Sequence, residues 1–338
     1  MTAHDELEGR YRRLMAAYPL RHRREYEEEM VGVLLAGAEP EQRRPSARDR
    51  ADILVNALAV RVRGWAGDLG DPAWRRAASA VQVVGALFLL IVGIRWVLPG
   101  LTFYPGVDAL EIARPAVWAV VFALALAGLR RLAAGIALAG ALVEIAHVAQ
   151  WYGYSPSQVL RSSWLVTVAL LVAVCSAWLA VGVRVAAPRG LWWFGAALAL
   201  AGCASVADQY QGMFHGFSYA VTMNDQFLFR YAAPLYLAAA ALAGWAWWRQ
   251  GSLVRRRILA LTAPVAAIAT MVTYGFAGFM YSSQQFPSPI LLRPFQWAIL
   301  LATPVVAFAV AVVALNRWER LSALVELGRR AETPEPRV

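Results

Sequence analysis

The sequence predicts an all-α membrane protein, and three observations carry this prediction. Of its 338 residues, 59% are hydrophobic and 16% are charged, with a mean hydropathy of +0.48, which is more apolar than a soluble domain. Apolar runs long enough to cross ~30 Å of hydrocarbon as helices recur from residue 77 onward. Charged residues are concentrated before these runs and between them. We therefore expect a cytoplasmic helical prefix over 1–72, a membrane bundle over 73–318 and a cytoplasmic tail over 319–338.

The prefix is expected to form three amphipathic helices. Apolar and aromatic residues recur at the spacing of one helical face from about 5 to 17 and again from about 21 to 35. Ser46, with Asp49 three residues later, resembles a capping box that opens a third helix. The first 75 residues lack the short apolar core of a cleavable signal peptide, so the N-terminus is expected in the cytoplasm. The apolar faces of these helices pack on one another or on the membrane surface.

A motif in the prefix resembles a known N-terminal segment. It reads YP-x-R-x-R-R-x-Y-x-E-E-M from Tyr18 to Met30. It resembles the prefix of many uncharacterised multi-pass membrane proteins of high-GC bacteria, and that of some ABC-transporter-type permeases. His22 stands where an aromatic residue is usual, and Glu27 where glycine is usual. The resemblance implies a membrane protein with a cytoplasmic regulatory prefix, and it assigns no catalytic residue.

Eight apolar runs predict eight membrane-spanning helices. They cover approximately residues 77–98, 113–129, 132–151, 164–183, 191–207, 231–248, 258–280 and 295–315. Alternate connections between them carry twelve Arg against four on the other side. Because positive loops stay in the cytoplasm, both termini are expected inside and the number of spans is even. This topology predicts a protein of the bacterial cytoplasmic membrane.

The net charge of +10 does not indicate a nucleic-acid-binding protein. Residues 1–76 hold 14 Arg and 13 acidic residues, so the excess lies in the membrane part and reports its topology. The partners expected are the lipid bilayer and, through residues 1–72, a cytoplasmic protein. Homo-oligomerisation is left open, and no cofactor is indicated.

Two spans begin with a similar motif. Arg114-Pro115 is followed by Trp118, and Arg293-Pro294 is followed by Trp297. One explanation is that Arg and aromatic residues both prefer the membrane interface. The other is a set of four tandem helical hairpins, an arrangement known in transporters.

Polar residues in the third run form the candidate site. Glu144 and His147 share one helical face, and Gln150 lies a further turn along it. Ionisable groups at membrane depth are costly and suggest a function. The other polar residues expected at a comparable depth on the outer side are Arg95, Asp208, Gln209 and His215.

Three interpretations of this cluster remain open. In the first, Glu144 pairs with Arg95 or caps neighbouring helices, and the cluster only fixes helix packing. In the second, the residues form an outward-facing pocket that binds a small ligand or passes protons. The third is a metal site in which Glu144 and His147 supply two ligands and His215 and Asp208 complete the set. An aromatic outer loop over 208–230 would cover the pocket in the second case.

The preferred function is that of a membrane sensor or accessory subunit in which the outer pocket is coupled to the cytoplasmic prefix. A small-solute transporter or permease component built from helical hairpins is the alternative. An enzyme is not favoured, because the sequence contains no phosphate-binding glycine-rich loop and Ser162 and Ser163 have no identifiable base nearby.

Overall fold

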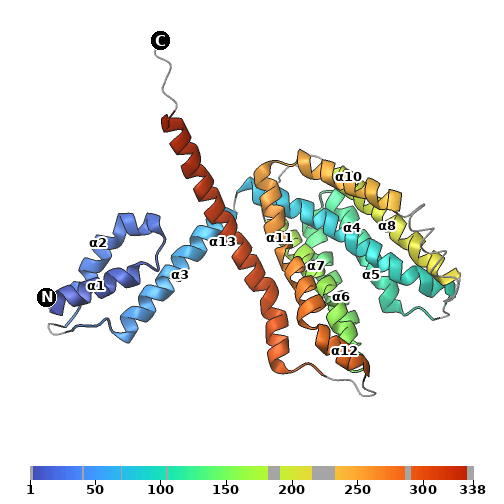
Figure 1. Ribbon diagram of the computed structural model, residues 1–338, viewed down its shortest axis with the longest axis horizontal. Helices are drawn as coiled ribbons and strands as arrows, with labels where there is room; N and C mark the ends of the chain where they lie inside the picture. The colour runs from blue at the N-terminus through green and yellow to red at the C-terminus, as the bar shows by residue number, and fades with distance from the viewer. Residues whose placement is uncertain are drawn as a thin grey trace, which may run out of the picture. The chain divides into compact units, whose positions relative to one another are not determined.

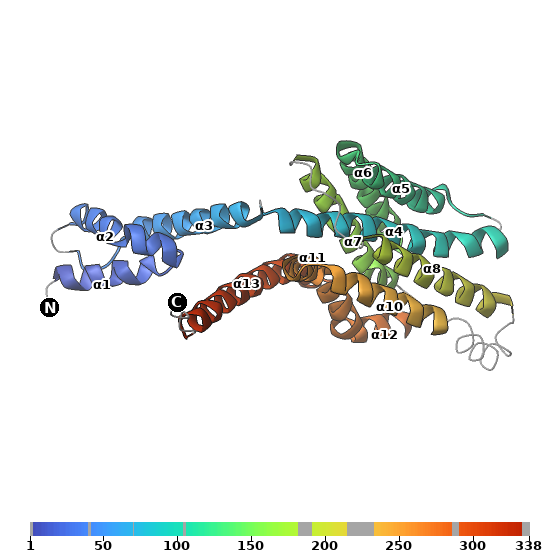
Figure 2. The ribbon, with the colours of Figure 1, turned by 90° about the horizontal axis from the view of Figure 1, so that it is seen from above.

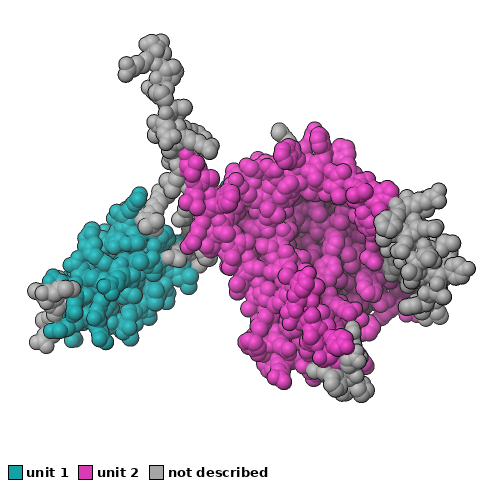
Figure 3. All heavy atoms as spheres, viewed as in Figure 1, with its two compact units in different colours: residues 1–71 teal, residues 72–338 magenta. Residues whose placement is uncertain are grey.

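The computed structural model describes residues 3–39, 42–69, 71–103, 106–181, 191–214, 233–285 and 291–332. All regular elements in these ranges are helices. The chain divides into two compact units, unit 1 (Met1–Asp71) and unit 2 (Pro72–Val338), which are coloured separately in Figure 3.

Unit 1 contains the three helices expected from the sequence. These are α1 (Ala3–Met15), α2 (Leu20–Ala36) and α3 (Ala47–Leu69). The capping box is confirmed, because the backbone N–H of Ser46 donates to Asp49 Oδ2 at 3.1 Å and that of Asp49 donates to Ser46 Oγ at 3.0 Å. Pro19 lies between α1 and α2, where its missing N–H is tolerated before the first helical turn.

The apolar faces of these helices form a core of their own. Leu7, Tyr11 and Met15, spaced four apart on α1, are each 1% exposed. They pack with Tyr18, Val31, Ile53 and Ala57. Arg12 of α1 also forms a two-pronged ion pair with Glu28 of α2, at 2.7 and 2.9 Å. Since Glu28 is largely exposed, this pair adds little to stability compared with the core.

Tyr11 ties α1 to the start of α3, because its hydroxyl donates to Asp49 Oδ2 at 2.8 Å. Burial and the contact with Asp49 raise the pKa of Tyr11 to about 12. The hydrogen bond from Tyr11 lowers the pKa of Asp49 below its usual value. The pair therefore favours a neutral phenol and an ionised carboxylate in the folded state.

The variant Tyr11→Phe is expected to destabilise unit 1 by about 1.5 to 3 kcal/mol, the range for a hydrogen bond to a charged group. The contribution of a carboxylate with a lowered pKa is present above its unfolded pKa of about 3.9 and is lost as the pH falls through the folded value. The difference between wild type and variant should therefore shrink below about pH 4. Hydrogen exchange of the α1 amides in the full chain measures it. Tyr26→Phe is the matched control, because Tyr26 is 39% exposed and bonds only to its neighbour Glu25.

The elements of unit 2 follow in chain order. They are α4 (Pro72–Phe103), α5 (Ala109–Leu126), α6 (Arg130–Ala149), α7 (Pro156–Val181), α8 (Leu191–Phe214), α10 (Ala233–Arg249), α11 (Ser252–Thr270), the π-helix η2 (Met271–Gly275), α12 (Ala277–Gln285) and α13 (Pro294–Glu332). Helix α4 is the centre of the unit and packs against α5, α7, α8 and α11 (Figures 1 and 2). Helices α5, α6 and α7 pack in succession, α10 lies beside α8, and α13 lies along α11.

The main core of unit 2 lies where α4, α5, α6 and α7 meet. Leu89, Trp118 and Val172 are buried there among alanines of α6 and α7. The small alanines let the helices approach closely, which is how helices associate where lipid removes the hydrophobic driving force. A tight turn joins α5 to α6, and Gly128 adopts a φ of +74° in it, a value that favours glycine.

Within the described residues, six helices are long and apolar enough to cross a membrane. They lie in α4, α5, α6, α7, α11 with η2, and α13. The prediction of an integral membrane protein is borne out at this level. The predicted spans at 191–207 and 231–248 coincide with shorter segments, Leu191–Val206 of α8 and the 17-residue α10, so a total of eight spans stays a prediction.

Helix α13 extends beyond the predicted end of the membrane bundle. The bundle was predicted to end at 318, the candidate membrane span ends at Glu319, and the helix itself continues without a break to Glu332. No proline or glycine interrupts residues 305–327, and their Ala, Leu, Arg and Glu residues favour helix on both sides of the hydrophobic boundary. The hydropathy of the segment changes there, whereas its helix propensity does not.

Candidate functional site

Glu144 forms a buried ion pair with Arg114. Glu144 lies five residues before the end of α6, and Arg114 lies five residues after the start of α5. Because α5 and α6 are antiparallel neighbours, these positions are level with each other. Arg114 Nη2 lies 2.9 Å from Glu144 Oε2, and Arg114 Nε lies 3.1 Å from both carboxylate oxygens. The side chains are 4% and 1% exposed.

Trp118 completes the environment of the carboxylate. It lies one turn after Arg114 on α5, and its indole Nε1–H donates to Glu144 Oε1 at 3.2 Å. Both oxygens of Glu144 therefore accept hydrogen bonds from α5. Charge-assisted, two-pronged contacts of this kind fix the geometry of a guanidinium–carboxylate pair.

Gly140 makes room for this arrangement. It lies one turn before Glu144 on α6, directly against α5. A Cβ at this position would lie 2.8 Å from Val117 Cγ1, which is closer than a methyl group can approach, and 3.2 Å from Trp118 Cζ2, which is a tight contact. The absence of a side chain lets the indole lie between α5 and α6 with its N–H directed at the carboxylate.

His147 and Gln150 form the more accessible part of the predicted cluster. Gln150 Nε2 lies 3.1 Å from His147 Nδ1, so the predicted proximity along one helical face is observed. His147 is half-buried and Gln150 is exposed at the C-cap of α6. The cluster therefore has a fully buried part, with Arg114, Trp118 and Glu144, and an accessible part, with His147 and Gln150.

The structure describes the other predicted site residues only in part. Arg95 is exposed on α4, and the partner of Glu144 is Arg114 rather than Arg95. Asp208 and Gln209 lie in the last turns of α8, where side chains are not described, and His215 lies outside the described residues. The predicted covering loop over 208–230 begins within α8, and its residues 215–230 lie outside the described residues. The metal interpretation depends on these side chains; where side chains are described, no three His, Cys, Asp or Glu residues come together as metal ligands.

Arg114 was expected at the outer end of the second span, and its role as the partner of Glu144 was missed. Helix α5 begins at Ala109, four residues before the predicted start at 113, so Arg114 lies more than one turn inside the helix and is buried. The misleading signal was hydropathy, since Asp108 and Glu111 made these residues resemble a loop. A usable signal was present in the spacing of Arg114 and Trp118, which puts both polar groups on one helical face.

A second buried polar contact was also missed. Gln82 of α4 donates through Nε2 to Ser176 Oγ of α7 at 3.0 Å, and that hydroxyl donates to the carbonyl of Val172 at 2.7 Å. Gln82 is 3% exposed and Ser176 is fully buried. Side-chain hydrogen bonds between membrane helices stabilise packing modestly, by about 1 kcal/mol. This contact joins α4 to α7 and forms no part of the Glu144 cluster.

At the opposite end of unit 2, Arg side chains lie over Trp rings. The guanidinium carbon of Arg257 lies 5.4 Å from the ring centre of Trp74, and those of Arg249 and Arg255 lie 5.0 and 5.7 Å from Trp245 and Trp248. Arg257 Nη2 also lies 3.8 Å from Oε1 of Glu319, a residue of α13. Such contacts are typical of the membrane–water interface.

Comparison with known proteins identifies no relative of this chain. No family model matches the chain, and no curated protein or solved structure matches it either.

Proposed function

We propose that this protein is a sensor or accessory subunit of the bacterial cytoplasmic membrane, with a regulatory prefix formed by unit 1. The observation that carries the proposal is the environment of Glu144. Both of its oxygens accept hydrogen bonds from Arg114 or Trp118. A carboxylate held in this way serves as a fixed contact between helices, whereas a transported cation or proton requires an acceptor that can exchange partners.

In this proposal, the accessible part of the cluster meets the ligand. His147 and Gln150 lie beyond the buried pair toward the end of α6, and Asp208, Gln209 and His215 are proposed to face them from the outer side. The buried pair holds α5 and α6 together beneath this surface. A ligand at His147 and Gln150 would then act on a rigid hairpin and not on a single mobile helix.

The proposed topology has eight spans with both termini in the cytoplasm. The Arg–Trp contacts of Arg249, Arg255 and Arg257 support it, because they lie at the end of unit 2 that the distribution of Arg assigns to the cytoplasm. The short segments of α8 and α10 are proposed to pair as the fifth and sixth spans. Bilayer thinning and snorkelling flanking residues allow short helices to cross.

Unit 1 is proposed as the regulatory part because it has its own core and a capping box that fixes the start of α3. The resemblance of Tyr18 to Met30 to permease-type prefixes supports the same role. In this proposal, a protein partner in the cytoplasm binds the prefix and responds to the state of the membrane unit.

Reconstitution into liposomes tests the proposal. Wild-type protein is expected to show no flux of protons, amino acids or sugars above that of empty liposomes. The matched sample carries Arg114→Met together with Glu144→Met, which removes both charges at once and leaves neither buried alone. A flux in wild type that is lost in this doubly neutral variant would reject the sensor in favour of a transporter.

A transporter is the second candidate, and the break after α11 favours it. The π-helix η2 follows α11 directly, and Phe276 separates it from α12. Interrupted helices line the substrate sites of many transporters, and π-helical turns are frequent at functional sites. A hairpin repeat, as proposed from the sequence, would agree with this role, and the two Trp residues of the repeated motif both donate to polar side chains: Trp118 to Glu144, and Trp297 to the hydroxyl of Tyr152 at 3.3 Å.

A further inference from the structure

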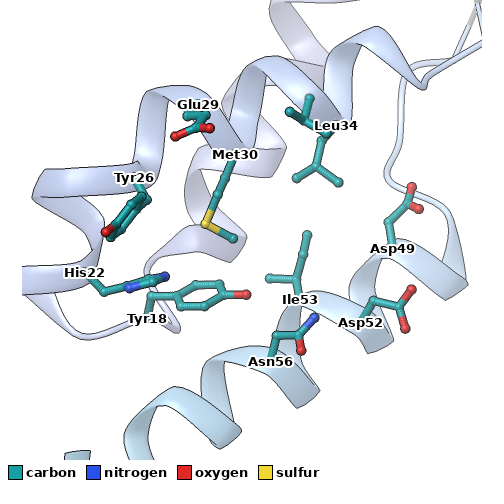
Figure 4. Close-up of a pocket in the computed structure, with 11 residues that line it drawn as sticks. Tyr18, His22, Tyr26, Glu29, Met30, Leu34, Asp49, Asp52, Ile53 and Asn56 are labelled. Carbon is teal, nitrogen blue, oxygen red and sulfur yellow. The ribbon is translucent and has the colours of Figure 1, made fainter.

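Unit 1 contains a cavity of about 470 Å³ between α2 and α3 (Figure 4). Helix α1 packs against both of these helices. The apolar part of the lining includes Met30 and Leu34 of α2 and Ile53 of α3. The volume falls within the range of sites that bind small molecules or anchoring side chains.

Three aromatic rings form one wall of the cavity. Tyr18, His22 and Tyr26 follow one another at every fourth position, and they lie together at one side of the cavity in Figure 4. The ring centres of Tyr18 and His22 are 5.1 Å apart, and those of His22 and Tyr26 are 4.9 Å apart. Tyrosine rings present a negative face, which attracts an ammonium or guanidinium group.

Three carboxylates line the same cavity. Glu29 comes from α2, and Asp49 and Asp52 come from α3. No Arg lines the cavity, although the chain contains 32 Arg, and His22 is the one lining residue with a basic side chain. Asp49 is kept ionised by the hydrogen bond from Tyr11, which lowers its pKa. In the described part of the chain, Glu29 and Asp52 form no ion pair with an Arg side chain. With His22 counted as neutral, the lining thus carries a formal charge of −3 beside an apolar surface.

We propose that this cavity binds a basic side chain, Lys or Arg, on an apolar segment of a partner protein. The carboxylates and aromatic rings would bind the cationic group of this side chain. Met30, Leu34 and Ile53 would contact its methylene groups. Two of the lining residues, Tyr26 and Val33, are 39% and 69% exposed, so apolar surface extends beyond the space that one side chain fills. An apolar rim around a charged cavity favours a protein segment over a free amine. The inference rests on the proposed function in taking unit 1 as the part that meets a partner.

Methyl NMR of the full chain in nanodiscs tests this inference, with [13C]methyl-methionine as the label. Met30 lies in the cavity, and Met30→Leu assigns its signal. The first probe is 2-phenylethylammonium, compared with neutral 2-phenylethanol. The second is a short amphipathic helical peptide with Arg on one edge of a Leu face, compared with the same peptide carrying Glu for Arg. Both cationic probes should shift the Met30 signal, and the Arg peptide should bind more tightly than the amine.

Glu29→Gln together with Asp52→Asn should weaken the binding of the Arg peptide about five- to tenfold, since each partly exposed charge contact contributes modestly. Glu39→Gln, an exposed carboxylate of unit 1 outside the cavity, should leave binding unchanged. Equal binding of the Arg and Glu peptides, no shift of Met30, or no effect of the double variant would each overturn the inference. A shift with the amine but not with the peptide would also overturn it, because the cavity would then take a free amine. None of these results depends on the liposome assay, so the proposed function can fail separately.

Discussion

Replacing Arg114 by Met is expected to lower the free energy of unfolding of the membrane unit by about 3 to 5 kcal/mol, the range for removing one partner of a buried pair. The variant leaves the carboxylate of Glu144, which is 1% exposed, without its counter-charge. Trp118 would remain as its hydrogen-bond donor at 3.2 Å, and one neutral N–H does not offset the loss of a guanidinium. Glu144→Met should have an effect of similar size, because it leaves Arg114 buried and uncompensated.

The double variant distinguishes the charge from the packing. Arg114→Met combined with Glu144→Met leaves no uncompensated charge, and neutral replacements of buried pairs are often tolerated. Its stability should therefore lie closer to wild type than that of either single variant. Unfolding in mixed micelles with increasing SDS, followed by circular dichroism, provides the measurement.

Arg293→Met is the matched control for this series. Arg293 stands before Pro294 and four residues before Trp297, as Arg114 stands before Pro115 and Trp118, yet its side chain is exposed. Its replacement should change stability by less than about 0.5 kcal/mol, as is usual for surface positions. Equal effects at Arg114 and Arg293 would contradict the assignment of the buried pair as the contact that holds α5 to α6.

Gly140→Ala is expected to destabilise the α5–α6 hairpin by about 1 to 3 kcal/mol, the usual range for overpacking a close contact. The new methyl group would meet Val117 at 2.8 Å and the Trp118 ring at 3.2 and 3.3 Å. Relief requires the indole to move, and this movement would also lengthen its hydrogen bond to Glu144. The same SDS titration measures the change.

Gly135→Ala on the same helix is the control for Gly140. A Cβ at position 135 meets no atom within 4 Å, so only helix propensity changes. Alanine should then be neutral, or stabilising by up to about 1 kcal/mol. If both variants changed stability equally, close packing at Gly140 would not be the reason that α6 carries glycine there.

Much of the fold could be predicted from the sequence because its causes are local. The length of an apolar run determines whether a helix can cross the membrane, and the described part of each predicted run is mostly helical, although the run over 258–280 is divided among α11, η2 and α12. The capping box at Ser46 and Asp49 was predictable for the same reason, since both of its hydrogen bonds join residues three apart. The contact between His147 and Gln150 likewise follows from the helical repeat.

The ion-pair partner of Glu144 could be identified only from the tertiary structure. It depends on which helix lies against α6 and on where α5 begins, and neither is set by residues near Glu144 in sequence. Four extra residues at the start of α5 place Arg114 more than one turn inside the helix, where it is a buried cation rather than the first polar residue of a span. The cavity of unit 1 is similar, because its rings come from 18–26 and two of its carboxylates from α3. The sequence by itself determined the helices and the membrane character, through local periodicity and hydropathy. The tertiary structure alone decided which polar groups meet, because hydrogen bonds and ion pairs act over a few ångströms between residues far apart in the chain.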